Sequence, residues 1–419
     1  MAITKIDSSM LEDVSGADNL VKLDANAKIP ACSGASLSVK PGPTKSASDP
    51  AVDSNKSLGA EWLNTTDGEM FICTDATTDE NVWTNVGAGT GDVVPFVYQG
   101  TSYGYSLGGH LDYNVIQKFS FTSDGNSSDV GDLLASTYNG AGSQSATHGY
   151  YTNGYNWISG SPGVQTYDIQ KFSFASGGNA VDTGYNTFTE GTEYARSGTP
   201  SSTDGNYCYL AGGYNTTSGD VSAIQRFAFD TSANATDVGD LSIRQQSGWG
   251  WSYNNTHGYH AGGYTGYVAP GWSGSNTTVI LKYAFAASGV TSSNVGNLTV
   301  ARRHCNGQGI NSTTHGYVGG GDAGSNDQSN VVDRMSFASD GNATDHGDLH
   351  EHVSYGAGNA TSTTHGYVFG GINSSETKLN KIQKFAFSSN TTGTDVGDLT
   401  GTSANDSGGT IKAVAGCHN

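Results

Sequence analysis

The feature that most constrains this chain is an internal repeat that fills everything after about residue 95. Its clearest copy contains Thr-His-Gly-Tyr at 364–367, Gly-Gly at 370–371, Phe-Ala-Phe at 385–387 and Asp-Val-Gly-Asp-Leu at 395–399. The tyrosine of the first motif recurs every 45 to 58 residues, as Tyr105, Tyr150, Tyr207, Tyr259, Tyr317 and Tyr367. A period near 50 with strand-length apolar segments is typical of repeat proteins built from small β-sheets.

We expect four strands in each unit, here named strands a, b, c and d. Strand a is a glycine-rich stretch such as 304–310, and strand b is the Gly-Tyr-Val-x-Gly-Gly segment. Strand c alternates polar and aromatic residues, as in 116–121, and strand d is Asp-Val-Gly-Asp-Leu, reached through Asp-Gly turns. Each glycine costs a helix interior about 0.5–1 kcal/mol relative to alanine. A chain with 60 glycines is therefore expected to be all-β.

The Gly-Gly pair that closes strand b, and the aromatic strand c that follows, resemble the kelch repeat. The pair stands at 108–109, 212–213, 262–263, 320–321 and 370–371, and is replaced by Asn-Gly at 153–154. The tryptophan that many kelch units carry in strand d is absent. The resemblance implies a β-propeller of four-stranded blades over residues 95–419, and by itself it implies no function.

The number of blades depends on how the chain ends. Residues 407–409 and 411–416 look like strands a and b of a seventh unit. We expect residues 69–74 and 81–87 to supply its strands c and d, because a half-blade would leave an unpaired edge. Seven blades would then close by pairing the two chain ends. The alternative is six blades, with residues 57–88 as an independent hairpin.

The N-terminal residues differ in composition from the repeats that follow. Residues 1–56 are polar, free of repeats and punctuated by prolines, which predicts an extended arm. Residues 57–94 are expected to form a β-hairpin segment that completes the last blade in the seven-blade arrangement. Residues 19–31 and 59–75 resemble the opening segments of bacteriophage tail-fibre and related virion proteins. That resemblance implies an arm that attaches to the particle and to other virion proteins, and a homo-oligomer with a trimer favoured.

Composition excludes several classes of partner. The formal net charge of −19 makes nucleic acid an unexpected ligand, because phosphates would be repelled. No stretch reaches the roughly 18–20 apolar residues of a membrane span, and the first residues lack the apolar core of a signal peptide. The five cysteines are far apart in sequence, so neither a disulfide framework nor a zinc site is expected.

No catalytic signature stands out, so the chain is not expected to be an enzyme or to need a cofactor. There is no Gly-x-Ser-x-Gly elbow, P-loop or paired acid–base motif. The motif histidines would lie on separate blades, so we interpret them as structural turn residues that hydrogen-bond the next blade, without a metal. These are His148, His257, His315 and His365. Aspartates beside the c–d turns are interpreted as turn formers, with a structural Ca²⁺ left open. A kelch-type enzyme is the less favoured alternative.

The candidate binding surface follows from variation between units. The a–b and c–d turns are nearly identical, whereas the b–c and d–a connections, which share one face of a blade array, differ greatly. Aromatic rings beside Asn, Gln and Ser suit a sugar or a protein surface. The candidate ligand-binding residues are Tyr155, Trp157, Trp249, Trp251, Tyr264, Tyr267 and Trp272. The alternative is that these rings form the cores of their own loops.

These observations together predict a virion protein on the surface of a phage particle. The leading expectation is a tail fibre or receptor-binding protein that recognises a host-surface glycan or protein through the propeller. A capsid-decorating protein with an exposed propeller is the alternative, since both roles need an anchor and an exposed module.

Overall fold

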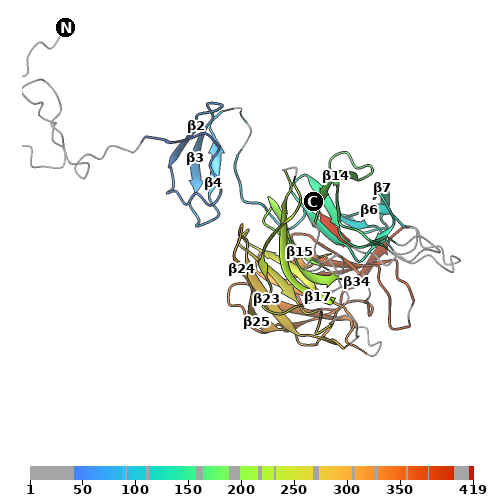
Figure 1. The fold of residues 1–419 in the computed structure, drawn as a ribbon. Helices are drawn as coiled ribbons and strands as arrows, with labels where there is room; N and C mark the ends of the chain where they lie inside the picture. Colours follow the sequence, from blue (N-terminus) through green and yellow to red (C-terminus); the bar gives the residue numbers. More distant parts are fainter. Residues whose placement is uncertain are drawn as a thin grey trace, which may run out of the picture. The chain divides into compact units, whose positions relative to one another are not determined.

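The computed structural model divides the chain into two units, Met1–Val94 and Pro95–Asn419 (Figure 1). It describes residues 42–419, apart from 88, 90–91, 110–112, 157–163, 188–198, 216–218, 231–232, 268–272, 304–306, 325–328, 355–356, 376 and 401–414. Every regular element in the described part is a β-strand, and none is a helix. The expectation of an all-β chain is confirmed. The predicted arm at 1–56 lies outside the described residues up to residue 41.

The smaller unit contains one four-stranded sheet. Its strands, in spatial order, are β1 (Thr44–Ser46), β2 (Glu61–Asn64), β3 (Met70–Asp75) and β4 (Val82–Asn85). β1 runs parallel to β2, and the remaining pairs are antiparallel. Phe71, Cys73 and Trp83 form its buried core, and Trp62 packs edge-on against Trp83. Residues 69–87 therefore do not complete a seventh set of strands, because β3 and β4 are paired within this sheet.

The described part of the larger unit contains six sets of four strands, each in the order a-b-c-d with antiparallel pairing. Four sets are separate sheets, and the third and fourth are joined through β26 (Gly307–Gln308) in one ten-stranded sheet. The sets are numbered 1 to 6 along the chain. Set 1 consists of β35 (Ala415–His418), β5 (Tyr103–Leu107), β6 (Val115–Ser120) and β7 (Ser128–Asp132). Set 2 consists of β9 (Ala141–Gln144), β10 (His148–Thr152), β13 (Asp168–Ser173) and β14 (Val181–Asn186). Set 3 consists of β15 (Pro200–Thr203), β16 (Tyr207–Asn215), β17 (Gly219–Ala228) and β18 (Thr236–Asp240).

The other three sets follow the same order. Set 4 consists of β19 (Trp249–Tyr253), β20 (His257–Ala261), β23 (Val279–Ala284) and β25 (Ser293–Asn297). Set 5 consists of β27 (Ile310–Asn311), β28 (His315–Gly319), β29 (Val331–Ser336) and β30 (Thr344–Asp348). Set 6 consists of β31 (Gly358–Thr361), β32 (His365–Phe369), β33 (Lys381–Ala386) and β34 (Thr394–Asp398). Short additional strands are β8 (Thr137–Tyr138), β11 (Tyr155–Asn156), β12 (Val164–Gln165), β21 (Tyr264–Thr265), β22 (Ser275–Asn276), β24 (Val290–Thr291) and β26 (Gly307–Gln308).

The C-terminal strand completes the first set. β35 pairs antiparallel with β5, so that Cys417 lies opposite Tyr105. This corrects the expectation that residues 411–416 form strand b of a seventh unit: the described end of the chain supplies strand a of set 1. The favoured count of seven is replaced by six sets in the described part. The chain ends do pair, but β5 rather than residues 69–87 is the partner.

Aromatic contacts join each set to the next. The motif tyrosine of one set packs against the second aromatic residue of the Phe-x-Phe segment in the next set, with ring centroids 4.4–5.2 Å apart. The pairs are Tyr105–Phe174, Tyr150–Phe229, Tyr209–Phe285, Tyr259–Phe337, Tyr317–Phe387 and Tyr367–Phe121. The sequence spacing had indicated Tyr207 as the repeating tyrosine of the third unit. In the structure it is Tyr209 that makes the equivalent contact. The last pair returns to set 1, so the contacts form a closed cycle.

Hydrogen bonds follow the same cycle. The turn asparagines Asn179 and Asn126 accept the backbone N–H of the last strand-d residue of the preceding set, Asp132 and Asp398, at 3.1 and 3.0 Å. A second row consists of buried strand-c side chains. Gln170 accepts the N–H of Leu134 at 2.9 Å, and Gln383, Asp333 and Gln117 accept in the same way from the preceding set. These side chains are buried away from solvent, so the preceding set must supply their hydrogen-bond partners.

The segment before β5 crosses strands a of several sets and the residues beside them. The Tyr98 hydroxyl donates to the carbonyl of Gly309 at 2.9 Å, and its own carbonyl accepts from the Gln144 amide at 3.1 Å. The N–H of Gly100 donates to the carbonyl of Thr361, and Thr101 bonds the carbonyl of Asn419. Both ends of the larger unit are therefore fixed among strands a, on the side of the a–b turns.

Candidate functional site

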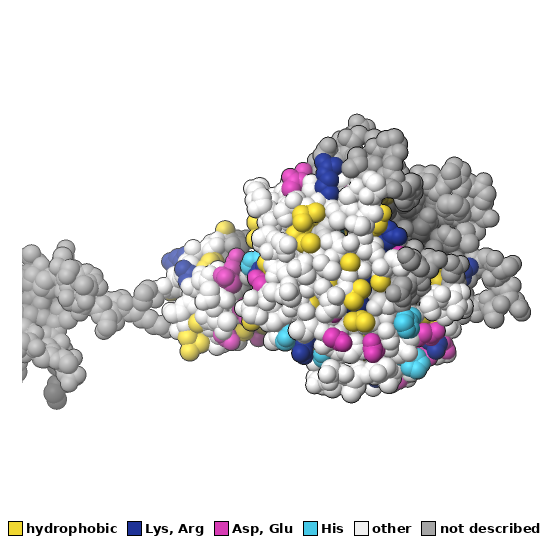
Figure 2. All heavy atoms as spheres, turned by 90° about the horizontal axis from the view of Figure 1, so that it is seen from below, with side chains coloured by type: hydrophobic (Ala, Val, Ile, Leu, Met, Phe, Trp, Pro, Cys, Tyr) yellow, Lys and Arg dark blue, Asp and Glu magenta, His cyan; other side chains and the backbone are white. Residues whose placement is uncertain are grey.

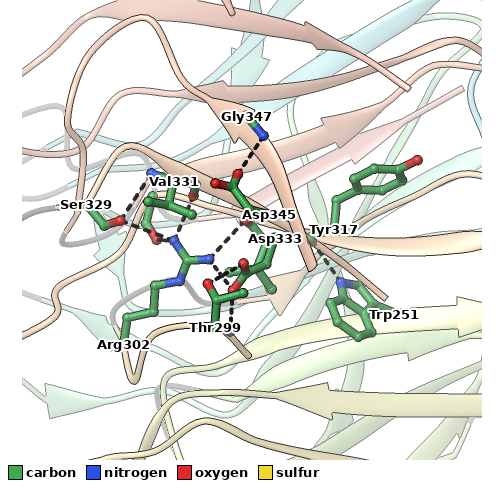
Figure 3. A network of polar contacts seen from close by, with 11 residues as sticks. Trp251, Thr299, Arg302, Tyr317, Ser329, Val331, Asp333, Asp345 and Gly347 are labelled. Atoms are coloured by element: carbon green, nitrogen blue, oxygen red, sulfur yellow. Dashed lines mark hydrogen bonds and ion pairs between the residues drawn. The ribbon is translucent and has the colours of Figure 1, made fainter. Parts of the chain in front are cut away.

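The predicted binding residues do not all lie on a surface. Trp249 and Trp251 are 1% and 0% exposed and belong to strand a of set 4. The Trp251 indole donates to the carbonyl of Tyr317 at 2.9 Å, which ties set 4 to set 5 (Figure 3). Their assignment as exposed loop residues is wrong, because the d–a connection ends before Trp249. They are core residues.

Tyr264 and Tyr267 lie on the predicted b–c and d–a face. Tyr264 is half-buried in β21; its hydroxyl donates to the carbonyl of Gly274 at 2.7 Å. The guanidinium of Arg303 lies 4.3 Å from its ring centroid and pairs with Asp322 at 3.2 Å. Tyr264 thus contributes to loop packing as well as to the surface.

Tyr267 is buried against the neighbouring hairpin. Its ring is 7% exposed and lies 5.5 Å from the ring of Tyr214 in set 3. Its N–H donates to one oxygen of buried Asp220 at 2.8 Å, and the Gln246 amide donates to the other at 2.7 Å. Burial raises the pKa of Asp220 to about 6, although these hydrogen bonds lower it. Asp220 therefore links the b–c loops of sets 3 and 4.

The remaining candidates cannot be placed as side chains. Tyr155 lies in β11, whose backbone pairs with β8 and β12. Trp157 and Trp272 lie outside the described residues. The structure therefore places Tyr264 and Tyr267 in the same b–c loop, where Tyr267 is buried as a loop-core residue and Tyr264 is half-buried. Trp249 and Trp251 do not belong to this surface. Sequence reasoning placed Gln246 in the d–a connection but missed Asp220, Arg303 and Asp322, the other polar residues that hold these loops together.

The four motif histidines make a local contact. The Nδ1 of each ring lies 2.8–2.9 Å from the hydroxyl of the preceding threonine. The histidines are His148, His257, His315 and His365. The expected hydrogen bond to the next blade is therefore replaced by one within the turn. Burial lowers the pKa of each of these rings, so the turns carry neutral imidazoles at neutral pH.

Other polar groups gather at two places. At the centre of the larger unit, His418 lies 2.7 Å from the Gln144 amide, and burial lowers its pKa to about 4. In the smaller unit, Asp49, Asp67 and Glu69 place one carboxylate oxygen each within 4.8 Å of one another. The Asn64 amide donates to Asp49 and Asp67, so two of these carboxylates already serve as acceptors for a side chain of the same sheet.

The visible surface of the larger unit offers no continuous apolar patch. Its side chains are mostly uncharged, with small mixed groups of histidine, acidic and basic residues and scattered hydrophobic ones (Figure 2). Within the described part of the chain, no helix is long and apolar enough to cross a bilayer. This surface suits hydrogen bonding to an uncharged polar partner more than burial against an apolar one.

Comparison with known proteins gives no family assignment. No protein-family model matches the chain, and no curated protein matches it significantly.

Proposed function

We propose that the larger unit is a six-bladed, kelch-like β-propeller. Six four-stranded sets, each bonded to the next and the last bonded to the first, support this arrangement. The C-terminal strand β35 would close the ring by completing the first blade, so that no sheet edge is left between the two chain ends. The divergent strand d, without its tryptophan, makes this a distant relative of kelch repeats.

We further propose that the protein is a phage virion component, with a tail fibre or receptor-binding protein as the leading role. The proposal rests on one observation: the chain enters the larger unit on one side, and the variable connections emerge on the opposite side. The chain enters on the a–b side, where the Asn255 amide donates to the carbonyl of Phe96 and Gly100 bridges to Ser362. The variable b–c and d–a connections emerge on the other side, which leaves them free to contact a host-surface glycan or protein.

The first experiment asks whether the protein is part of a particle. Antibody–gold labelling of intact purified phage should place it at the tail tip for a fibre, or over the head for a capsid-decorating protein. The particle role would be lost if purified phage contained no such polypeptide by mass spectrometry.

The second experiment tests the recognition face. Replacing Trp157 and Trp272 by alanine should weaken attachment of the full chain to host cells at least tenfold, because removing an aromatic anchor at a binding centre commonly costs about 2 kcal/mol or more. The melting temperature should stay unchanged. The matched control is Trp62→Ala in the smaller unit, which should leave attachment intact. Undiminished attachment by the double variant would exclude this face.

A further inference from the structure

One junction between sets is built differently from the other five. At the five, a strand-d glycine packs so tightly on the next set that a methyl group there would come within 3.0 Å of its backbone. These glycines are Gly131, Gly239, Gly296, Gly347 and Gly397. Between sets 2 and 3, Gly184 stands at this position, and its N–H donates to the Asp182 carboxylate at 2.8 Å, a bond with an equivalent in the other sets. Nothing lies within 4 Å of the place where a methyl group on Gly184 would be. Sets 2 and 3 are still joined by the hydrogen bonds seen at other junctions, from the Asn186 N–H to the Asn234 side chain at 3.0 Å and from the Ala235 N–H to the carbonyl of Asn186 at 2.8 Å. Within the described residues, the difference is confined to the bulge at Gly184.

The cause is visible in the sequence of strand d. In set 1, Gln117 and Val115 pair with Asp129 and Asp132. In set 2, the equivalent Gln170 and Asp168 pair with Asp182 and Asn186, so β14 contains one extra residue in its bulge. The segment reads Asp-Thr-Gly-Tyr-Asn in place of Asp-Val-Gly-Asp. The insertion adds Tyr185 and gives Gly184 a φ of +75°, whereas Gly131 in set 1 has a φ of +153°.

Set 2 also lacks the valine that four other sets have at this position; in set 5 the position is His346, whose ring packs against Tyr317 and Phe385. Val130, Val238, Val295 and Val396 pack against the aromatic residues of the following set. Set 2 has Thr183 at this position, and its hydroxyl donates to the carbonyl of Ile169 at 2.8 Å. The added Tyr185 packs instead against the core that sets 2 and 3 share, which includes Ile169 and Phe227.

The result is a depression of about 200 Å³ between β14 and β17. The residues that give it chemical character are Tyr150, Lys171, Asp182, Tyr185, Phe229 and Asp230. In sets 4 and 6 the residues equivalent to Lys171 pair with an aspartate of the next turn, as in Lys282–Asp340 at 3.0 Å and Lys384–Asp124 at 2.7 Å. Lys171 forms no ion pair within the described residues, so its ammonium is available at the depression.

This lining selects a class of ligand. Two carboxylates disfavour an anion such as a phosphate, and Lys171 disfavours a cation. The ammonium donates hydrogen bonds and the carboxylates accept them, which matches the hydroxyl groups of a neutral sugar. Tyr185 and Phe229 offer aromatic surface to the apolar face of such a ring. The volume is below the roughly 300–1,000 Å³ of pockets for larger ligands, which fits one ring rather than a chain.

We propose that this junction is a binding site for a single neutral monosaccharide residue, separate from the b–c and d–a face and independent of the function proposed above. The insertion in β14 distinguishes this junction from the others, and Lys171, Asp182 and Asp230 supply polar groups to the lining of its depression.

Saturation-transfer NMR on the full chain tests this with the methyl glycosides of glucose, galactose, mannose and N-acetylglucosamine. At least one sugar should receive saturation from the wild-type protein, and Tyr185→Ala should reduce that transfer at least fivefold. A second variant deletes Tyr185 and carries Thr183→Val, which restores the strand-d length and the valine found in set 1 and should abolish transfer. Tyr103→Ala is the matched control, because Tyr103 lies away from the depression, is exposed and has the Lys118 ammonium 4.6 Å from its ring.

Two results would overturn the proposal. One is the lack of transfer to any of the four sugars, and the other is transfer that persists undiminished in Tyr185→Ala with an unchanged melting temperature. Should the deletion variant fail to fold, Tyr185→Ala and Lys171→Ala decide the outcome. Attachment to host cells is read separately through Trp157 and Trp272, so failure of either proposal leaves the other intact.

Discussion

Asp333 occupies the strand-c position that glutamine holds in sets 1, 2, 3 and 6. An uncharged amide can remain in a dry junction with hydrogen bonds alone, but a carboxylate needs a counter-charge. Arg302 supplies it: its Nη2 lies 2.7 Å from the carboxylate, and both side chains are almost completely buried (Figure 3). Arg302 also donates to the carbonyls of Gly320 and Val331 at 3.1 and 2.7 Å.

This pair gives a prediction about stability. Arg302→Met should lower the free energy of unfolding by about 3–5 kcal/mol, because it leaves a buried carboxylate unpaired. The double variant Arg302→Val with Asp333→Gln should recover most of that loss, because set 6 uses Gln383 with Val353 at the equivalent places. Urea unfolding followed by fluorescence measures both. A double variant as unstable as Arg302→Met would contradict this explanation.

Asp220 gives a prediction about pH. Its folded-state pKa, about 6, lies above the ordinary value of 3.8. A raised carboxyl pKa means that the folded state binds the proton more tightly than the unfolded state, so its contribution to stability is present below pH 4 and is lost as pH rises through 6. Wild type should therefore lose stability relative to Asp220→Asn between pH 4 and pH 7. Urea unfolding at four pH values tests this, and a constant difference between the two proteins would refute it.

At the scale of elements, the sequence predicts much of the repeat and misses its exceptions. Gly370 and Gly371 adopt φ of +67° and +85° after strand b, which is why the Gly-Gly pair was a dependable marker. Tyr207 was misplaced because the third unit has a tyrosine on both sides of Cys208, and only packing against Phe285 distinguishes Tyr209. Ser247 and Gly248 stand directly before Trp249, and Ser247 has a φ of +56°, so a turn signal was present. The prediction nevertheless extended the d–a connection past this turn, and it therefore missed the burial of Trp249.

The C-terminal strand was missed for a different reason. Short glycine-rich strands have few side chains that distinguish one from another. In addition, the partner of β35 lies more than 300 residues earlier in the chain. The candidate site was less predictable still, because it depends on contacts between loops of different sets. The insertion in strand d of set 2 was the exception: a comparison of Asp-Thr-Gly-Tyr-Asn with Asp-Val-Gly-Asp could have revealed it.

Removing β35 tests its role as a structural element. Deleting residues 415–419 should expose the edge of β5 and withdraw Cys417 from the core it shares with Tyr105 and Leu107. We expect the melting temperature to fall by more than about 5 °C, since loss of a strand costs several kcal/mol, and size-exclusion chromatography should show association. Deletion of residues 1–41 serves as the control for truncation. A C-terminally shortened protein that melts like the full chain would show that β35 contributes little.

At the scale of the whole larger unit, two sets of contacts describe the same closed order. Aromatic pairs and hydrogen bonds each pass from set 1 to set 6 and return. Such closure gives a repeat array a fixed geometry, with conserved turns on one side and divergent connections on the other. Both proposed binding sites depend on this order. The host-contact face lies on the side of the b–c and d–a connections, and the sugar site lies at the junction between sets 2 and 3.

The most direct test is carbodiimide cross-linking of the full chain, read by mass spectrometry of the monomer. Closure by six sets places Lys384 of set 6 and Asp124 of set 1 at 2.7 Å, and both side chains are accessible to reagent. We predict an Asp124–Lys384 cross-link as abundant as the Lys282–Asp340 cross-link between sets 4 and 5, which forms whatever the number of sets. A seventh set between sets 6 and 1 would separate Lys384 from Asp124. Formation of the Lys282–Asp340 cross-link without the Asp124–Lys384 one would therefore contradict the six-set ring.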